Sequence, residues 1–359
     1  MCFTFYKEIS LEMFAIKTMK LGKTGLEVSR IGFGGIPIQR PPEDEAIRVV
    51  QRALDLGINF IDTSVGYGTS ELRIGKALVG QREEVILATK GGWHDKEMVR
   101  GSLTMSLRQL KTNYIDIWQF HNVSSLEAYH SLFRFNGPME AAFEALSKET
   151  IRYLGISSHS LEVAREAVIS GKFDTIQFPF NFVYEDAAKE LIPLAKEQGV
   201  GFIGMKPFAG GMILKANLAL KYILQFENVL PDPGLETIEQ VDEIIGLLES
   251  PLDIKADEQA EMELIRAELG TKFCRQCGYC QPCPNGVNIS LIMIAPIMWK
   301  LWPHENLTSS WYKNAIESGN QCLQCGECED KCPYQLPIRE MIRDNLIFYA
   351  NLLIDISSS

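Results

Sequence analysis

Residues 59–71 of this chain are Asn-Phe-Ile-Asp-Thr-Ser-Val-Gly-Tyr-Gly-Thr-Ser-Glu. The segment begins as a short apolar strand, ends that strand at Asp62, and places Tyr67 in the turn that follows. In parallel α/β proteins the catalytic groups sit where strands end and loops begin, so these two side chains are expected to face one cavity. A structural role is the alternative, because tyrosines pack in glycine-flanked turns and aspartates cap them.

Strand-length and helical patterns alternate on both sides of this segment. Runs such as residues 85–88 are apolar throughout, as strands covered by helices on both faces require, and no glycine-rich dinucleotide fingerprint of open sheets is present. The pattern predicts an α/β fold with a closed (β/α)8 TIM barrel in preference to an open doubly wound sheet. After a hairpin over residues 17–30, the expected strands are 28–35, 59–64, 85–90, 115–121, 153–157, 175–180, 201–207 and 228–230, and the expected helices are 43–56, 70–78, 99–110, 139–148, 161–169, 185–198 and 236–248.

The chain of 359 residues is longer than a barrel of about 250 residues needs, so a second module is expected. A charged helical stretch over residues 251–270 marks the boundary. We expect an N-terminal extension over residues 1–16, a barrel over residues 17–255, and a small, mostly α-helical domain over residues 256–359.

Charge and hydropathy exclude two classes of partner. The formal net charge of -11 argues against nucleic acid, which demands a basic face. No apolar run approaches the roughly 18 residues that cross a bilayer, so no membrane segment is expected. Residues 1–16 resemble neither a signal peptide nor a transit peptide. The remaining partners are small molecules and other proteins.

Two later strand ends carry further ionisable groups. Lys90 follows the apolar run that ends at residue 89, and His121 follows residues 118–120. A lone lysine or histidine at such a place is more often a surface or structural residue. Together with Asp62 and Tyr67, however, they put four ionisable groups at one face of the predicted barrel, which favours a catalytic site.

From residue 17 to residue 248 the chain resembles the aldo-keto reductase family. The matching motifs are residues 62–71, Lys90, residues 110–117 leading to His121, and residues 155–159. The resemblance implies that Asp62, Tyr67, Lys90 and His121 form the catalytic tetrad of an enzyme that transfers hydride between a nicotinamide and an aldehyde, ketone or alcohol.

Elementary chemistry supports these roles. Reduction of a carbonyl leaves charge on oxygen that must be protonated, and Tyr67 is the expected acid, with a pKa lowered by the ammonium of Lys90. Asp62 would hold Lys90 in place, and His121 would orient the carbonyl through a hydrogen bond. This step needs no metal.

The resemblance also implies a binding site for NAD(H) or NADP(H). Ser157, Ser158 and Gln177 would hold the carboxamide, and the turn over residues 206–211 would cover the pyrophosphate. Two departures stand out: Met205 occupies the place of a tyrosine that stacks on the nicotinamide in many members, and residues 230–240 carry acids and no base. The second predicts that NAD(H) is accepted at least as well as NADP(H). The expected cofactor-binding residues are Gly35, Asp62, Ser157, Ser158, Gln177, Lys206, Phe208 and Gly210.

Eight of the nine cysteines lie in two groups near the C-terminus, each ending in Cys-Pro. Their spacing is close to that of ferredoxin-type [4Fe–4S] motifs, and an apolar helix is expected after each, over residues 289–299 and 336–353. Zinc is the alternative, because paired Cys-x-x-Cys motifs also bind zinc. The expected metal ligands are Cys274, Cys277, Cys280 and Cys283 in the first group and Cys322, Cys325, Cys328 and Cys332 in the second.

The assignment of cysteines to clusters stays open at this point. By analogy with two-cluster ferredoxins, Cys332 would join the first three cysteines of the first group, and Cys283 would join the first three of the second. Local sets of four are the alternative. The spacing suits metal ligation rather than disulfides, which indicates a cytoplasmic protein.

The sequence therefore predicts a nicotinamide-dependent aldo-keto reductase with two [4Fe–4S] clusters. A nicotinamide gives two electrons together and each cluster takes one, so the two cannot exchange electrons directly. Exchange would need an external flavoprotein or ferredoxin-type partner. Otherwise the clusters are structural or sensory. The alternative function is a redox-sensing or electron-transfer protein on a reductase scaffold with little or no turnover. The loop sequences do not indicate which substrate the protein uses.

Overall fold

The computed structural model describes residues 16–358. The expected N-terminal extension over residues 1–16 therefore lies outside the described residues, apart from its last residue, Ile16. None of the helices within residues 16–358 is both long and apolar enough to cross a membrane.

Eight strands form one sheet in which every neighbouring pair runs parallel and the spatial order follows the sequence. Each of the expected strands is present, but the first is shorter than expected, because residues 27–29 pair in the hairpin instead. The strands are β3 (Phe33–Gly34), β4 (Phe60–Asp62), β5 (Ile86–Gly91), β6 (Ile115–Phe120), β7 (Ile151–Ser157), β8 (Thr175–Pro179), β9 (Gly201–Met205) and β10 (Val229–Asp232).

The first and last strands meet and close the sheet into a TIM-like barrel. The amide of Gly34 donates to the carbonyl of Pro233 at 2.8 Å, and a parallel bridge joins Gly34 to Gly234. A Cβ on Gly34 would lie 2.8 Å from the Pro233 oxygen, so this contact requires a glycine. The closed sheet brings the carboxyl ends of all eight strands to one rim.

The other end of the barrel is covered by a hairpin of β1 (Thr18–Lys20) and β2 (Glu27–Ser29), which pair antiparallel as expected. Leu21 and Val28 of this hairpin pack with a small cluster of apolar side chains inside the barrel. That cluster is completed by Phe60, Ala88, Ile117, Ile203 and Leu230. The barrel is therefore filled below its carboxyl rim.

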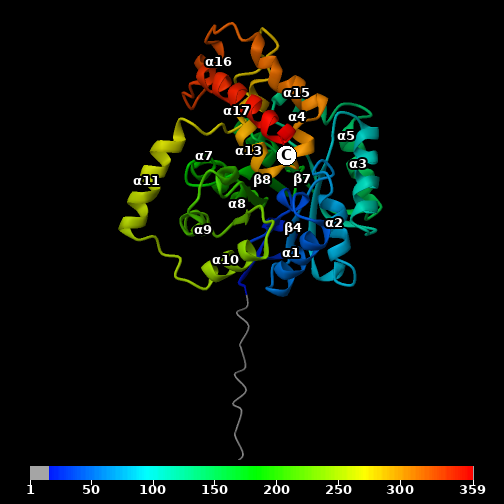
Figure 1. The fold of residues 1–359 in the computed structure, drawn as a ribbon. Coiled ribbons are helices and arrows are strands. Elements are labelled where there is room, and N and C mark those ends of the chain that lie inside the picture. Colours follow the sequence, from blue (N-terminus) through cyan, green and yellow to red (C-terminus); the bar gives the residue numbers. More distant parts are fainter. Residues whose placement is uncertain (1–15, 359) are drawn as a thin grey trace, which may run out of the picture.

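Helices cover the outside of the sheet (Figure 1). Their inward faces are small and branched apolar residues, and Asp95, Ser160 and Thr237 cap three of them by accepting a backbone N–H. The helices are α1 (Glu43–Asp55), α2 (Ser70–Ala77), α3 (Lys96–Gln109), α4 (Leu126–Ser131), α5 (Pro138–Ser147), α6 (Leu161–Ile169), α7 (Asp186–Lys189), α8 (Leu191–Glu197), α9 (Ala216–Leu224) and α10 (Ile238–Leu248).

Two expected helices are each broken in two, and the helices α4 and α9 were not expected. The helix predicted over residues 185–198 breaks at Glu190, three residues before Pro193. The one predicted over residues 289–299 breaks at Ile294, two residues before Pro296. In both cases the proline lacks an N–H and its ring clashes with the preceding turn, so the helix has to restart just before it.

The C-terminal region, residues 256–358, begins with the long helix α11 (Ala256–Gly270) beside the barrel and then crosses over the barrel's rim (Figure 1). Ion pairs between Lys221 and Glu258 and between Arg266 and Glu185 tie α11 to the barrel. The remaining helices are α12 (Ile289–Met293), α13 (Ala295–Leu301), α14 (His304–Leu307), α15 (Ser310–Glu317), α16 (Glu327–Asp330) and α17 (Ile338–Ser358).

Candidate active site

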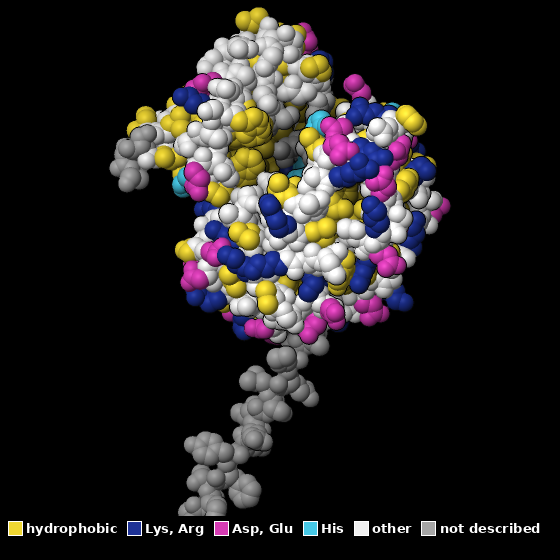
Figure 2. All heavy atoms as spheres, turned by 90° about the vertical axis from the view of Figure 1, so that its right-hand side faces the viewer, with side chains coloured by type: hydrophobic (Ala, Val, Ile, Leu, Met, Phe, Trp, Pro, Cys, Tyr) yellow, Lys and Arg dark blue, Asp and Glu magenta, His cyan; other side chains and the backbone are white. Residues whose placement is uncertain are grey.

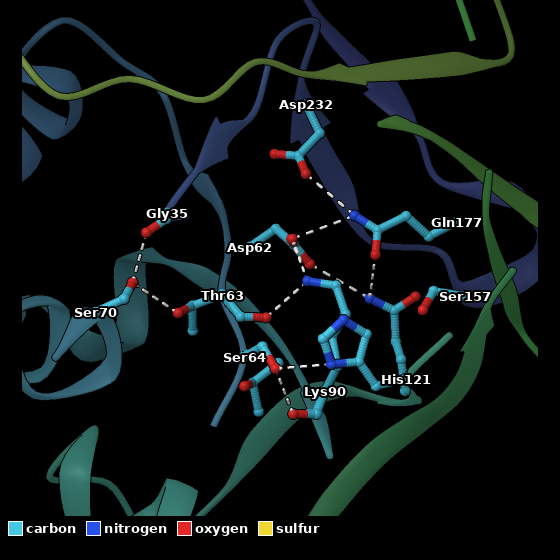
Figure 3. A network of polar contacts seen from close by, with 12 residues as sticks. Gly35, Asp62, Thr63, Ser64, Ser70, Lys90, His121, Ser157, Gln177 and Asp232 are labelled. Atoms are coloured by element: carbon cyan, nitrogen blue, oxygen red, sulfur yellow. Dashed lines mark hydrogen bonds and ion pairs between the residues drawn. The ribbon is translucent and has the colours of Figure 1, made fainter. Parts of the chain in front are cut away.

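A buried ion pair lies at the carboxyl rim between β4 and β5. Lys90 Nζ donates to Asp62 Oδ2 at 2.5 Å and to the carbonyl oxygen of Thr63 at 2.7 Å (Figure 3). The two side chains are 2% and 4% exposed. Burial lowers the pKa of Lys90, but the interaction with Asp62, followed by smaller ones with Tyr67 and Asp232, raises it by more, so the pKa ends above its usual value. Lys90 is therefore a fixed buried cation.

Tyr67 lies over this cation. The ammonium of Lys90 is 4.9 Å from the centroid of the Tyr67 ring. Burial raises the pKa of Tyr67, the charge of Lys90 lowers it, and Asp62 and Asp232 raise it again, so that the pKa is raised overall. The expectation of a net lowered pKa was wrong, because burial outweighs the ammonium. The phenol consequently stays protonated at neutral pH, as a proton donor must.

His121 follows β6 and completes the expected group of four. Its ring meets that of Tyr67 edge to face, with centroids 5.6 Å apart and planes at 82°. Burial, and then the charge of Lys90, lowers the pKa of His121 to about 3, so the imidazole is neutral. The structure thus brings all four residues together from three strand ends, as parallel strands predict.

Ser64 sets which nitrogen of His121 carries the proton. Its Oγ lies 3.0 Å from His121 Nδ1 and 3.1 Å from the carbonyl oxygen of Lys90, while it accepts the amide of Gly66 at 3.1 Å (Figure 3). One hydroxyl proton can serve only one of these acceptors. When Ser64 donates to Nδ1, the ring proton is on Nε2; when it donates to Lys90, the ring proton is on Nδ1.

A second carboxylate stands beside the ion pair. Gln177 Nε2 donates to Asp62 Oδ2 at 3.2 Å and to Asp232 Oδ2 at 3.1 Å, and Gln119 Nε2 donates to Gln177 Oε1 at 3.3 Å (Figure 3). Asp232 Oδ1 and Gln119 Oε1 are buried, with no hydrogen-bond partner among the described residues. Burial and the charge of Asp62 raise the pKa of Asp232 well above its usual value.

A cavity of about 600 Å³, open to solvent, extends from this group across the rim. Asp62, Tyr67, Gln177 and Asp232 line its inner end. Its volume lies within the usual range of about 300–1,000 Å³ of a small-ligand pocket. Figure 2 shows a hollow between the C-terminal region above and the barrel below, with hydrophobic side chains along its wall.

Most of the residues expected to bind the cofactor line this cavity, namely Gly35, Asp62, Gln177, Lys206, Phe208 and Gly210. Met205 lines it too. The hydroxyls of Ser157 and Ser158 are instead buried against the backbone, where Ser157 Oγ accepts the amide of Asn122 at 2.8 Å and Ser158 Oγ accepts that of Ser160 at 3.0 Å. Their role toward a nucleotide stays a prediction.

The far end of the cavity carries cations that the local sequence did not show. Glu236 and Gln240 from residues 230–240 line it together with Glu243, but Arg40 and Lys300 line it as well. Arg40 Nη1 pairs with Glu236 Oε1 at 3.2 Å. Two bases from distant parts of the chain therefore reach this end of the cavity, and the preference between NAD(H) and NADP(H) stays a prediction.

Lys206 connects the cavity to the first cysteine motif. Its Nζ lies 2.9 Å from His159 Nε2 and also donates to Gln276 Oε1, in the loop between Cys274 and Cys277. Burial lowers the pKa of Lys206 to about 8, against a smaller opposing effect of Cys274. The turn expected to cover the pyrophosphate is thus attached to the C-terminal region at its first residue.

The eight cysteines are free thiols around two small cavities of the C-terminal region, whose volumes, open solvent included, are about 360 Å³ and 390 Å³. Within residues 16–358, no three His, Cys, Asp or Glu side chains converge closely enough to hold a single metal ion. Cys280 borders both cavities. The smaller cavity is otherwise lined by Cys274, Cys277 and Cys332, and the larger by Cys283, Cys322, Cys325 and Cys328.

Reasoning from the sequence gave no role to Ser64, Gln119, Asp232, Arg40 or Lys300. Asp232 had a usable signal, because it ends the apolar run of β10 as Asp62 ends β4. Ser64 also had one, since it stands two residues beyond Asp62 in the same turn. Arg40 and Lys300 had none, because only the folded chain brings them together.

The site and the barrel agree with the comparison to known proteins. Residues 30–219, more than half of the chain, match the Aldo/keto reductase family, so the protein belongs to this family. The match ends before the C-terminal region.

Two curated relatives resemble the chain at moderate identity. An uncharacterised oxidoreductase of Bacillus subtilis is 30% identical over 56% of this chain and 68% of its own length. The L-galactose dehydrogenase of Arabidopsis thaliana is 34% identical over the same shares.

Solved structures show the same fold. The holo form of an aldo-keto reductase from Bacillus halodurans superposes with a TM-score of 0.61 at 27% identity, over 70% of this chain and 96% of that one. An aldo/keto reductase from Klebsiella pneumoniae, solved in complex with NADP and acetate, superposes with a TM-score of 0.60 over 70% of this chain and 96% of that one. Its identity of 21% supports the shared fold alone.

Proposed function

We propose that this oxidoreductase reduces an aldehyde or ketone, or oxidises the corresponding alcohol, with a nicotinamide dinucleotide as the hydride carrier. The observation that carries the proposal is the buried pair of Lys90 and Asp62 directly beneath Tyr67, at the inner end of a large cavity. A fixed buried cation next to a protonated phenol is what a proton donor to a developing alkoxide needs.

The residues at the cavity suit a nicotinamide dinucleotide. The cavity is long enough to reach from Tyr67 to Arg40, and its inner end offers the unpartnered Asp232 Oδ1 to an amide N–H. Gly35 and Gly210 line the cavity, and each needs to be a glycine for a packing reason, since a Cβ would lie 2.9 Å from Ser70 Oγ or 2.8 Å from Ile297 Cγ2. Gln177, Lys206 and Phe208 would hold the group, and when bound it would supply the hydride.

Tyr67 then gives its hydroxyl proton to the carbonyl oxygen as the carbon receives the hydride pair. The phenolate that remains is stabilised by Lys90, which Asp62 keeps charged, and the phenol regains its proton from solvent. With the hydroxyl of Ser64 donated to His121 Nδ1, the Nε2–H of His121 is free to orient the carbonyl oxygen. The same steps in reverse oxidise an alcohol.

A substrate screen on pure protein kept under anaerobic conditions tests this function. Aldehydes, ketones and alcohols are offered with each nicotinamide nucleotide, and the absorbance of the reduced nicotinamide is followed. We expect turnover with a subset of carbonyl compounds. Tight nucleotide binding without turnover of any compound would instead favour a binding or sensing protein on this scaffold.

We further propose that the C-terminal region, residues 256–359, is a domain that binds two [4Fe–4S] clusters. Three thiols that line only the smaller cavity, together with Cys280, make the set expected from the crossed ferredoxin pattern, and the other four line the larger cavity. Four thiols around a cavity suit a group of several iron and sulfide atoms, whereas zinc needs all its thiolates about 2.3 Å from one ion. A reducing compartment such as the cytoplasm suits these thiols.

Iron and sulfide analysis of anaerobically purified protein tests the clusters. We expect about eight iron atoms and about eight sulfides per chain, together with the visible absorbance and EPR signals of [4Fe–4S] centres. Zinc without sulfide would contradict the proposal.

A structural or sensory role for the clusters is simpler than electron transfer during turnover. A hydride carries two electrons and each cluster accepts one, so exchange would need an external flavoprotein or ferredoxin-type partner. EPR distinguishes these roles. Reduction of the clusters by nicotinamide alone would contradict a structural role, and reduction only after adding a flavoprotein would indicate such a partner.

A further inference from the structure

The C-terminal region meets the barrel at the turn η4 (Ala209–Gly211), which follows β9. Helix α13 packs directly on this turn: a Cβ on Gly210 would lie 2.8 Å from Ile297 Cγ2. Gly210 also has a φ of +67°, which side chains rarely adopt. The turn is therefore shaped to accept α13.

The end of α13 forms one wall of the large cavity, where Trp299, Lys300 and Leu301 line it opposite residues of the barrel. Lys300 Nζ donates to the carbonyl oxygen of Gly211 at 3.2 Å. The backbone carbonyl of Lys300 in turn accepts from Arg40 Nη1. Both ends of this lysine are thus attached to the barrel beside the cavity.

Arg40 and Lys300 differ in whether a carboxylate pairs with them. Arg40 is paired with Glu236 at 3.2 Å, so its charge is largely compensated. Within residues 16–358, Lys300 has no carboxylate partner, and only the Gly211 oxygen accepts from its Nζ. A lysine that reaches a cavity without a counter-ion can bind a phosphate as a point charge.

We infer that Lys300, contributed by the C-terminal region, binds a phosphate group of the nicotinamide dinucleotide, and that Arg40 positions it through its backbone carbonyl. This inference rests on the proposed use of a nicotinamide dinucleotide. The nucleotide site is then completed by a region outside the family match. The phosphate is either the pyrophosphate, present in NADH and NADPH, or the 2′-phosphate, present in NADPH alone.

The test is calorimetric titration of NADH and of NADPH into the full-length protein and into Lys300→Gln, with Lys313→Gln on helix α15 as the matched control. Loss of a hydrogen bond between charged groups should raise the dissociation constant about 10-fold to 100-fold. A rise for both nucleotides identifies the pyrophosphate, and a rise for NADPH alone identifies the 2′-phosphate. Lys313→Gln should leave both constants unchanged.

Further readouts separate a charge contact from a packing role. The dissociation constant of the wild type should rise with ionic strength more steeply than that of Lys300→Gln, and Lys300→Arg should restore most of the affinity. If the variant binds both nucleotides as the wild type does, the inference is overturned while the proposed function stands. If the wild type binds neither nucleotide, the proposed function itself fails.

Discussion

The carboxyl rim of the barrel and the cysteine cavities of the C-terminal region differ in how their polar groups find partners. In the barrel, Lys90 is held by Asp62 and by the carbonyl of Thr63, and Gln177 links Asp62 to Asp232. In the C-terminal region eight thiols surround two cavities as free cysteines, with Cys325 exposed and the others partly buried.

This difference shows which of the two sites is held in place by the protein's own hydrogen bonds, without a ligand. Hydrogen bonds between protein groups fix the proposed catalytic residues before any ligand arrives, as a preorganised active site requires. Thiols around a cavity gain their partners only from a ligand, so the free energy of metal binding becomes free energy of folding. We expect the barrel to keep its shape without ligands and the C-terminal region to depend on the clusters that we propose it binds.

The largest expected effect concerns the acid. Tyr67→Phe keeps the ring over Lys90 but removes the proton, and carbonyl reduction should fall by about 10²-fold to 10⁴-fold. Nucleotide affinity, measured by calorimetry, should change little. Tyr153→Phe is the matched control, since the Tyr153 hydroxyl donates to the Thr24 carbonyl near the covered end of the barrel. Unchanged turnover in Tyr67→Phe would show that the preorganised group is not catalytic.

A second prediction uses the pKa of His121, which burial and then Lys90 lower to about 3. An unfolded histidine titrates near pH 6.5, so below that pH the unfolded chain binds the proton more readily. The stability due to this neutral histidine is complete above about pH 6.5 and is lost as the pH falls toward about 3.

Removing the imidazole in His121→Gln should therefore flatten the dependence of unfolding free energy on pH by up to about 1.4 kcal/mol per pH unit in that window. Urea unfolding of both proteins at about pH 7, about pH 6 and about pH 5 measures the difference. Parallel curves for the two proteins would contradict the buried neutral state.

Ser64 should have a smaller effect, because it acts through His121. In Ser64→Ala the imidazole loses its partner at Nδ1 and is free to take the other tautomer. Carbonyl reduction should fall up to about tenfold, the scale of one net hydrogen bond, with nucleotide affinity unchanged. Nitrogen NMR of His121 distinguishes the two tautomers, and an unaltered spectrum in Ser64→Ala would remove the serine from this role.

The last comparison concerns which thiols act together. Cys274 and Cys332 line the same cavity. In the crossed arrangement they therefore bind the same cluster. Each single change to serine should lower the iron content of the protein by about half. The double change should lower it no further, because the two act on one site. Loss of nearly all iron in the double variant would favour local sets of four, and Cys2→Ser, outside both motifs, should have no effect.

Much of the barrel could be predicted because strand and helix patterns are local. The meeting of Asp62, Lys90 and His121 at one rim followed from the predicted barrel, since parallel strands end on the same side. Their catalytic roles, which the resemblance to aldo-keto reductases implies, stay a prediction. The pKa of Tyr67 could not be predicted, because it depends on how fully the fold buries the phenol. The contact between Arg40 and Lys300 joins positions 260 residues apart, and no local pattern encodes it.

The central claim is hydride transfer at the barrel, and isotope transfer tests it most directly. NADH and NADPH carrying deuterium on one face of the nicotinamide C4 are incubated with a carbonyl compound that the protein turns over, and the alcohol is analysed by mass spectrometry. The account predicts one deuterium on the former carbonyl carbon from one face only, formed far more slowly by Tyr67→Phe. Nucleotide oxidation that gives an alcohol without deuterium would mean that the electrons leave by another route, and would contradict it.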